Sequence, residues 1–135
     1  MVNSGETFRK SERLCSKKAF EALFDNGKTF FCSPFLIVWS YNNAEALSPA
    51  LVAFSVPKKE FKLAVTRNLI KRRMREAYRK NKIVLYDYLN TSDKKIVFTM
   101  IYRGKSISDF TTFENAVKQM IKMFIRTLEE SKPKC

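Results

Sequence analysis

The side chains best suited to chemistry in this sequence are basic, and they gather in one segment. Residues 64–80, AVTRNLIKRRMREAYRK, hold a dense run of Arg and Lys with a single acid, Glu76. On a helix, like charges four residues apart destabilise by about 0.2–0.5 kcal/mol per pair. A merely solvated helix usually mixes charges of both signs, whereas this one keeps a single sign. The pattern therefore favours the binding of a polyanion.

The periodicity of this segment separates an apolar face from two basic edges. At about 100° per residue, Ile70, Met74, Ala77 and Tyr78 share the face suited to packing. One basic edge holds Asn68, Lys71, Arg72, Arg75, Arg79 and Lys82, and the other holds Leu69, Arg73 and Lys80. Because the guanidinium group grips phosphate with two hydrogen bonds, the preference for Arg indicates phosphate.

Composition narrows the class of protein further. Lys and Arg outnumber Asp and Glu by 26 to 13, and the net charge of +13 points to nucleic acid or an anionic membrane. The chain has no histidine for proton transfer, its acids are scattered, and its three glycines form no phosphate loop. We therefore do not expect catalysis by this polypeptide alone.

Cysteine usage and hydropathy bear on the compartment. Cys15, Cys32 and Cys135 have no metal-ligand spacing, and one would be left over from any disulfide. This is typical of a reducing cytosol. The N-terminus shows no signal peptide, and no apolar run approaches the roughly 20 residues of a membrane span. We expect a cytoplasmic protein.

The alternation of apolar and polar residues predicts one α+β domain over residues 1–135, with 1–13 and 131–135 as flexible tails. Strands are expected over 28–32, 35–41, 50–56 and 94–102, with helices from Ser16 to Gly27, over about 66–82, and from a capping box of Thr111 and Glu114. The order α-β-β-β-α-β-α predicts a two-layer α-β sandwich, with helices packed on a four-stranded sheet.

A longer stretch, residues 54–79, resembles a family signature. FSVPKKEFKLAVTRNLIKRRMREAYR is similar to the protein component of bacterial ribonuclease P, in which a strand ending Val-Ser-Lys-Lys precedes a helix opening Arg-Asn-Arg and continuing Ile-Lys-Arg. The matching positions are Ser55, Val56, Lys58, Lys59, Ala64, Val65, Arg67, Asn68, Ile70, Lys71, Arg72 and Arg75. Residues 13–28 also resemble the family's first helix, so the similarity spans nearly the whole chain.

The resemblance implies a small subunit that binds a catalytic RNA and, together with it, removes the 5′ leader of precursor tRNA. It assigns the hydrolysis to the RNA and its Mg²⁺ ions, and implies no obligate protein partner and no membrane. It further implies a left-handed β-α-β crossover of the ribosomal protein S5 domain 2 type, against the usual right-handed rule. The residues expected to contact RNA are Lys58, Lys59, Lys62, Arg67, Asn68, Lys71, Arg72, Arg73, Arg75 and Arg79.

One position departs from the family pattern. The second Arg of Arg-Asn-Arg is Leu69 here, which removes a guanidinium at what is usually an RNA contact. Arg73, one turn later on the same edge, is our candidate for reaching a neighbouring phosphate instead. If this hypothesis is correct, replacing Arg73 with Ala lowers the affinity for the RNA.

The resemblance also implies a cleft for the single-stranded leader, between the first helix and the sheet. Its residues would be Phe20 and Phe24 on the helix and Leu36 and Val38 on the facing strand. Aromatic rings can stack on unpaired bases of any sequence, although Phe at this spacing is also typical of a core. Trp39 should face away from Val38, because strand side chains alternate.

Other interpretations stay open at this point. A ribosome-associated or general RNA-binding protein is the main alternative, since basic helices on α-β sandwiches recur there. A DNA-binding helix would need helix-turn-helix spacing, which the sequence lacks. A membrane-surface helix would need a wider apolar face than Met74 and Ala77 provide.

Overall fold

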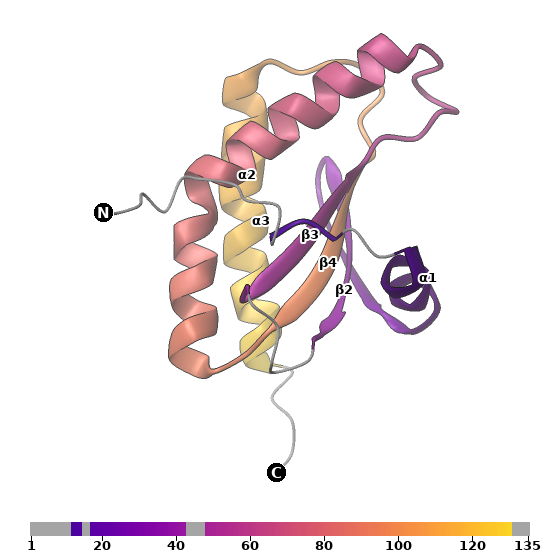
Figure 1. Ribbon diagram of the computed structural model, residues 1–135. Coiled ribbons are helices and arrows are strands. Elements are labelled where there is room, and N and C mark those ends of the chain that lie inside the picture. The colour runs from indigo at the N-terminus through magenta and orange to yellow at the C-terminus, as the bar shows by residue number, and fades with distance from the viewer. Residues whose placement is uncertain (1–11, 15–16, 43–47, 131–135) are drawn as a thin grey trace.

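The computed structural model describes residues 12–14, 17–42 and 48–130 (Figure 1). The elements are α1 (Lys17–Asn26), β1 (Lys28–Cys32), β2 (Phe35–Tyr41), β3 (Ala50–Ser55), α2 (Ala64–Ser92), β4 (Ile96–Tyr102) and α3 (Phe110–Glu130). The predicted order of helices and strands is therefore confirmed. The expected cap at Ser16, the expected tail 131–135 and residues 1–11 of the expected tail 1–13 lie outside the described residues.

The four strands form one mixed sheet in the order β1-β2-β4-β3. β2 pairs antiparallel with both β1 and β4, whereas β3 pairs parallel with β4. Parallel neighbours need a long crossover connection, which α2 supplies here. The β-α-β unit that the resemblance implies is thus present, and its left hand stays a prediction.

The alternation of side chains in β2 divides the core between the two faces of the sheet. Phe35, Ile37 and Trp39 are fully buried in the main core, which α2 and α3 cover. Val38 points the other way and packs with Leu23 of α1 in a smaller cluster. Figure 1 shows α2 and α3 on one side of the sheet and α1 on the other. The expected sandwich is confirmed, with α1 added on its outer face.

α2 is longer than the sequence predicted, since it runs to Ser92 rather than to about residue 82. The reason is that Leu85 and Leu89 continue its buried face after the run of basic residues has ended. It stops at Asp93, whose left-handed backbone (φ 56) lets its N–H bond the carbonyl of Asn90. Among the described residues, no helix is long and apolar enough to cross a membrane.

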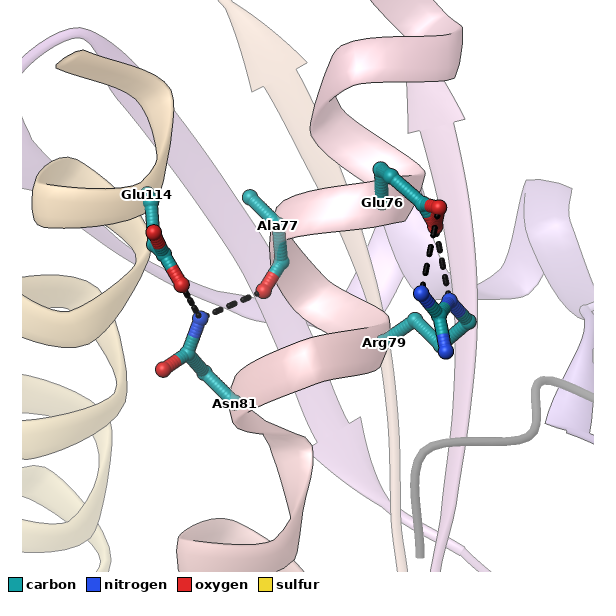
Figure 2. A network of polar contacts seen from close by, with 5 residues as sticks. All are labelled: Glu76, Ala77, Arg79, Asn81 and Glu114. Atoms are coloured by element: carbon teal, nitrogen blue, oxygen red, sulfur yellow. Dashed lines mark hydrogen bonds and ion pairs between the residues drawn. The ribbon is translucent and has the colours of Figure 1, made fainter. Parts of the chain in front are cut away.

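The predicted capping box at the start of α3 is wrong. The helix begins at Phe110, and the Asp109 carboxylate accepts a hydrogen bond from the Thr112 N–H at 2.9 Å. Asp is the stronger N-cap acceptor, and it precedes the expected Thr111 by two residues. Glu114 instead accepts a hydrogen bond from Asn81 of α2 at 3.3 Å, so it joins the two helices (Figure 2).

Candidate RNA interface

The connection between β3 and α2 is anchored to the core and to Arg67, and it exposes three lysines to solvent. Phe61 is buried in the main core, and the Arg67 guanidinium donates hydrogen bonds to the carbonyls of Phe61 and Lys62, both at 2.9 Å. The side chains of Lys58, Lys59 and Lys62 are exposed. Arg67, predicted as an RNA contact, therefore also fixes the connection that carries these three lysines.

Four of the five predicted RNA-binding arginines of α2, all except Arg67, line an open hollow of about 490 Å³, here called the arginine hollow. Its lining consists of Arg13, Arg72, Arg73, Arg75, Glu76, Arg79 and Phe110. Arg72, Arg75, Glu76 and Arg79 recur at three- and four-residue spacing and so share one side of the helix, whereas Arg73 joins them from the other basic edge. Five guanidinium groups against one carboxylate make this hollow suited to an anion, and to phosphate in particular.

Glu76 orients one of the arginines that line the hollow. The Arg79 guanidinium donates two hydrogen bonds to the Glu76 carboxylate, Nε to Oε1 at 2.7 Å and Nη2 to Oε2 at 3.1 Å (Figure 2). The hydrogen bond from Arg79 holds the pKa of Glu76 below its usual value, and nearby Lys80 and Arg75 add to the effect. Glu76 therefore stays ionised at neutral pH and keeps Arg79 beside the hollow.

Arg73 and Arg75 are tied to other elements. Arg73 donates a hydrogen bond to the Ser108 carbonyl at 2.6 Å, which joins α2 to the connection before α3. The Arg75 guanidinium lies 5.9 Å from the ring centre of Phe54 on β3. Both side chains still line the arginine hollow. Compensation for Leu69 by Arg73 stays a prediction.

Lys82 does not belong to the basic edge where its spacing had placed it. It is 3% exposed and forms an ion pair with Glu12, which also accepts a hydrogen bond from the Tyr86 hydroxyl at 2.6 Å. Here α2 is covered by the N-terminal segment, which periodicity within the helix does not reveal. Glu12 and Arg13, expected in a flexible tail, are likewise held against the fold.

The four residues expected in the leader cleft differ in exposure, since Phe24 is exposed, Phe20 and Leu36 are half-buried, and Val38 is buried. Phe24 is 47% exposed, and its ring centre lies 4.9 Å from that of the half-buried Phe20. Leu23 of α1 takes the core position, where it covers Val38, which is 5% exposed. Leu36 is half-buried. Phe24 and, in part, Phe20 are therefore open to solvent, whereas Val38 is packed in the smaller cluster with Leu23.

Sequence reasoning missed one aromatic residue on this outer face. Phe31 pairs directly with Leu36 across β1 and β2, so the two side chains point to the same side of the sheet. Phe31 is 54% exposed, whereas its neighbours Phe30 and Cys32 turn toward the main core. The alternation of side chains along β1 was sufficient to predict that Phe31 points outward. Phe31 thus adds a second exposed aromatic ring to the outer face.

Cysteine and acidic side chains form no metal centre in the part of the chain that the structure describes. No three or more His, Cys, Asp or Glu side chains gather there as metal ligands. Cys32 is a free thiol buried in the main core, and burial raises its pKa. It packs as a small apolar strand residue. Cys15 and Cys135 lie outside the described residues.

A basic helix that connects two parallel strands, with four of its arginines around an open hollow, is typical of an α+β protein that binds nucleic acid. The sequence pattern of the family described as Ribonuclease P matches residues 8–128. The "Ribonuclease P protein component" of Porphyromonas gingivalis W83 is 33% identical over 112 residues, covering 83% of this chain and 82% of that protein. The ribonuclease P protein component of Petrotoga mobilis is 30% identical over 121 residues, covering 87% of this chain and 95% of that protein. This chain belongs to the family of bacterial ribonuclease P protein components.

Solved structures agree with this assignment. The ribonuclease P protein from Thermotoga maritima superposes with a TM-score of 0.66 at 26% identity, covering 83% of this chain and 96% of that one. The Staphylococcus aureus protein, at 20% identity and a TM-score of 0.64, shows the same fold. Family membership means RNA binding and tRNA processing, and it implies an RNA partner within an endoribonuclease holoenzyme.

Proposed function

We propose that this chain binds the catalytic RNA of ribonuclease P through α2 and the 5′ leader of precursor tRNA through the outer face of the sheet. It thereby assists removal of the leader in the bacterial cytoplasm. In this proposal the Mg²⁺ ions and the hydrolytic step belong to the RNA, and the protein residues bind and orient. The observation that carries the proposal is the arginine hollow on α2.

The geometry of α2 supports contact with several phosphates of a folded RNA. Arg72, Arg75 and Arg79 follow one another at close to one helical turn, which is about 5.4 Å along the axis. Lys58 and Lys59 extend the positive surface to the connection before the helix. A protein that neutralises many phosphates releases counterions, so its affinity falls steeply as salt rises. The helix thus supplies most of the affinity expected for the catalytic RNA.

The outer face of the sheet supports contact with an unpaired strand. Phe24 and Phe31 expose aromatic rings there, and the half-buried Leu36 lies beside Phe31. Stacking on such rings contributes about 1–3 kcal/mol per base and tolerates every base. A leader differs in sequence from one precursor tRNA to the next. A stacking surface is therefore suited to it better than base-specific hydrogen bonds.

Reconstitution tests the proposed function directly. The purified chain is mixed with a bacterial ribonuclease P RNA at low Mg²⁺, and cleavage of a precursor tRNA is followed, with each component alone as control. We expect 5′ cleavage to be efficient only when both are present. If the chain binds RNA but leaves cleavage unchanged with several ribonuclease P RNAs, it is a general RNA-binding protein and the proposal is wrong.

Replacing Phe24 with Ala is expected to weaken leader binding. Loss of one stacked base should lower the affinity of the holoenzyme for precursor tRNA about tenfold, within the range of about 1–3 kcal/mol per base. Affinity for mature tRNA, which has no leader, should not change. Met123 of α3 is also exposed and offers a matched control as Met123→Ala. An equal loss for precursor and mature tRNA would show that Phe24 does not contact the leader.

A further inference from the structure

Arg13 occupies a position between α2 and the sheet that its place in the sequence does not indicate. It lines the arginine hollow together with the α2 arginines. It also lines a second depression, beside Leu14, Val52, Ala53, Phe54, Lys71 and Arg75. Arg13 and Arg75 are common to both. One residue from the segment before α1 thus lies within the positive surface built by α2.

The backbone on both sides of Arg13 is fixed. Glu12, which precedes it, is 6% exposed and forms the buried ion pair with Lys82. Leu14, which follows it, donates its N–H to the Val52 carbonyl at 2.9 Å. The side chain of Arg13 between them is exposed. This segment therefore holds a guanidinium group in a defined place while leaving it open to solvent.

The buried Glu12–Lys82 pair is better explained by a role in positioning the N-terminal segment than by a contribution to the stability of the fold. Removing two charges from water costs free energy that their attraction offsets only in part, so such pairs are weak contributors to stability. A well-attested role of buried polar groups is to fix the register of one element on another. Here the elements are the N-terminal segment and α2. In that role the pair would determine which residue of the segment faces the arginine hollow.

The charge of the hollow favours an anion at this place. Arg13 adds a positive group beside Arg72 and Arg75, where like charges repel. A guanidinium has five N–H donors in a fixed fork, which matches the oxygens of a phosphate. A phosphate group between these arginines would offset the repulsion and accept their hydrogen bonds.

We propose that Arg13 is a phosphate-binding residue of the RNA interface, which completes the arginine hollow from outside α2, and that the Glu12–Lys82 pair positions it. The ligand is a backbone phosphate of the catalytic RNA. This inference rests on the proposed function.

The test is binding of the full chain to a bacterial ribonuclease P RNA transcript at a series of salt concentrations. Arg13→Gln should lower affinity roughly tenfold and make the log-log salt slope shallower by about 0.7–0.9, the amount expected for one phosphate contact. Arg126→Gln removes the same charge from an exposed site on α3, about 24 Å along that helix from Phe110. It should leave both quantities close to wild type. Circular dichroism confirms that each variant is folded, and Arg13→Lys, which disturbs the segment less, should lose part of the affinity.

Two outcomes separate this inference from the proposed function. If the wild-type chain neither binds the RNA nor stimulates cleavage, the proposed function fails. If the wild type does both while Arg13→Gln matches Arg126→Gln, only the inference fails.

The positioning role has its own readout. In a Glu12→Gln background, Arg13→Gln should cause a smaller loss of affinity than in the wild type, because Arg13 is no longer held in place. Strictly additive losses would overturn the role of the pair.

Discussion

Replacing Lys82 with Met is expected to lower the free energy of unfolding by about 3–5 kcal/mol, the range found when one partner of a buried ion pair is removed. The substitution leaves the Glu12 carboxylate buried without its cation, because Glu12 is 6% exposed. The Tyr86 hydroxyl still donates to Glu12. Burial is the main cause that raises the pKa of Tyr86, and the hydrogen bond to Glu12 adds to it, so the hydroxyl stays protonated. One neutral hydrogen bond does not replace a paired charge.

Urea unfolding followed by circular dichroism measures this loss. Lys80→Met is the matched control, since Lys80 is an exposed residue of the same helix, and it should change stability by no more than about 0.5 kcal/mol. The double variant Glu12→Leu/Lys82→Met removes both charges and should recover most of the stability. Equal midpoints for Lys82→Met and Lys80→Met would mean that the pair does not anchor the N-terminal segment.

Replacing both Arg72 and Arg75 with Ala is expected to weaken binding to the catalytic RNA about a hundredfold or more at physiological salt. Hydrogen bonds to charged groups are worth about 1.5–3 kcal/mol each, and both guanidinium groups line the arginine hollow. The log-log salt slope should become shallower by about 1.4–1.8, since two phosphate contacts are removed. Binding titrations at several salt concentrations give both quantities.

The matched control removes two positive charges elsewhere. Lys122→Ala/Arg126→Ala changes two exposed side chains of α3 and leaves the arginine hollow intact. Its affinity should fall only slightly, through the lower net charge of the protein. If the two double variants weaken binding equally, the affinity comes from overall charge, and α2 is not the specific RNA contact.

Local patterns in the sequence predicted the order of the elements and much of the basic surface. Periods of 2 and 3.6 residues depend only on neighbours along the chain, so Trp39 and Val38 were placed correctly on opposite faces. The same rule would have placed Phe31 outward. The end of α2 was predicted less well, because its apolar face continues through Leu85 and Leu89 after the basic run has ended.

Contacts between distant parts of the chain decided the rest. Lys82 has the spacing of an RNA-binding residue, yet it is buried because Glu12 packs against it. Arg13 is one of two arginines in residues 1–13, which were expected to form a flexible tail, yet it lines the hollow of α2. The sequence by itself determined that α2 is basic and that the chain resembles a ribonuclease P protein. Only the tertiary structure decided which charges face outward, because burial depends on segments that meet in space and not on spacing within one helix.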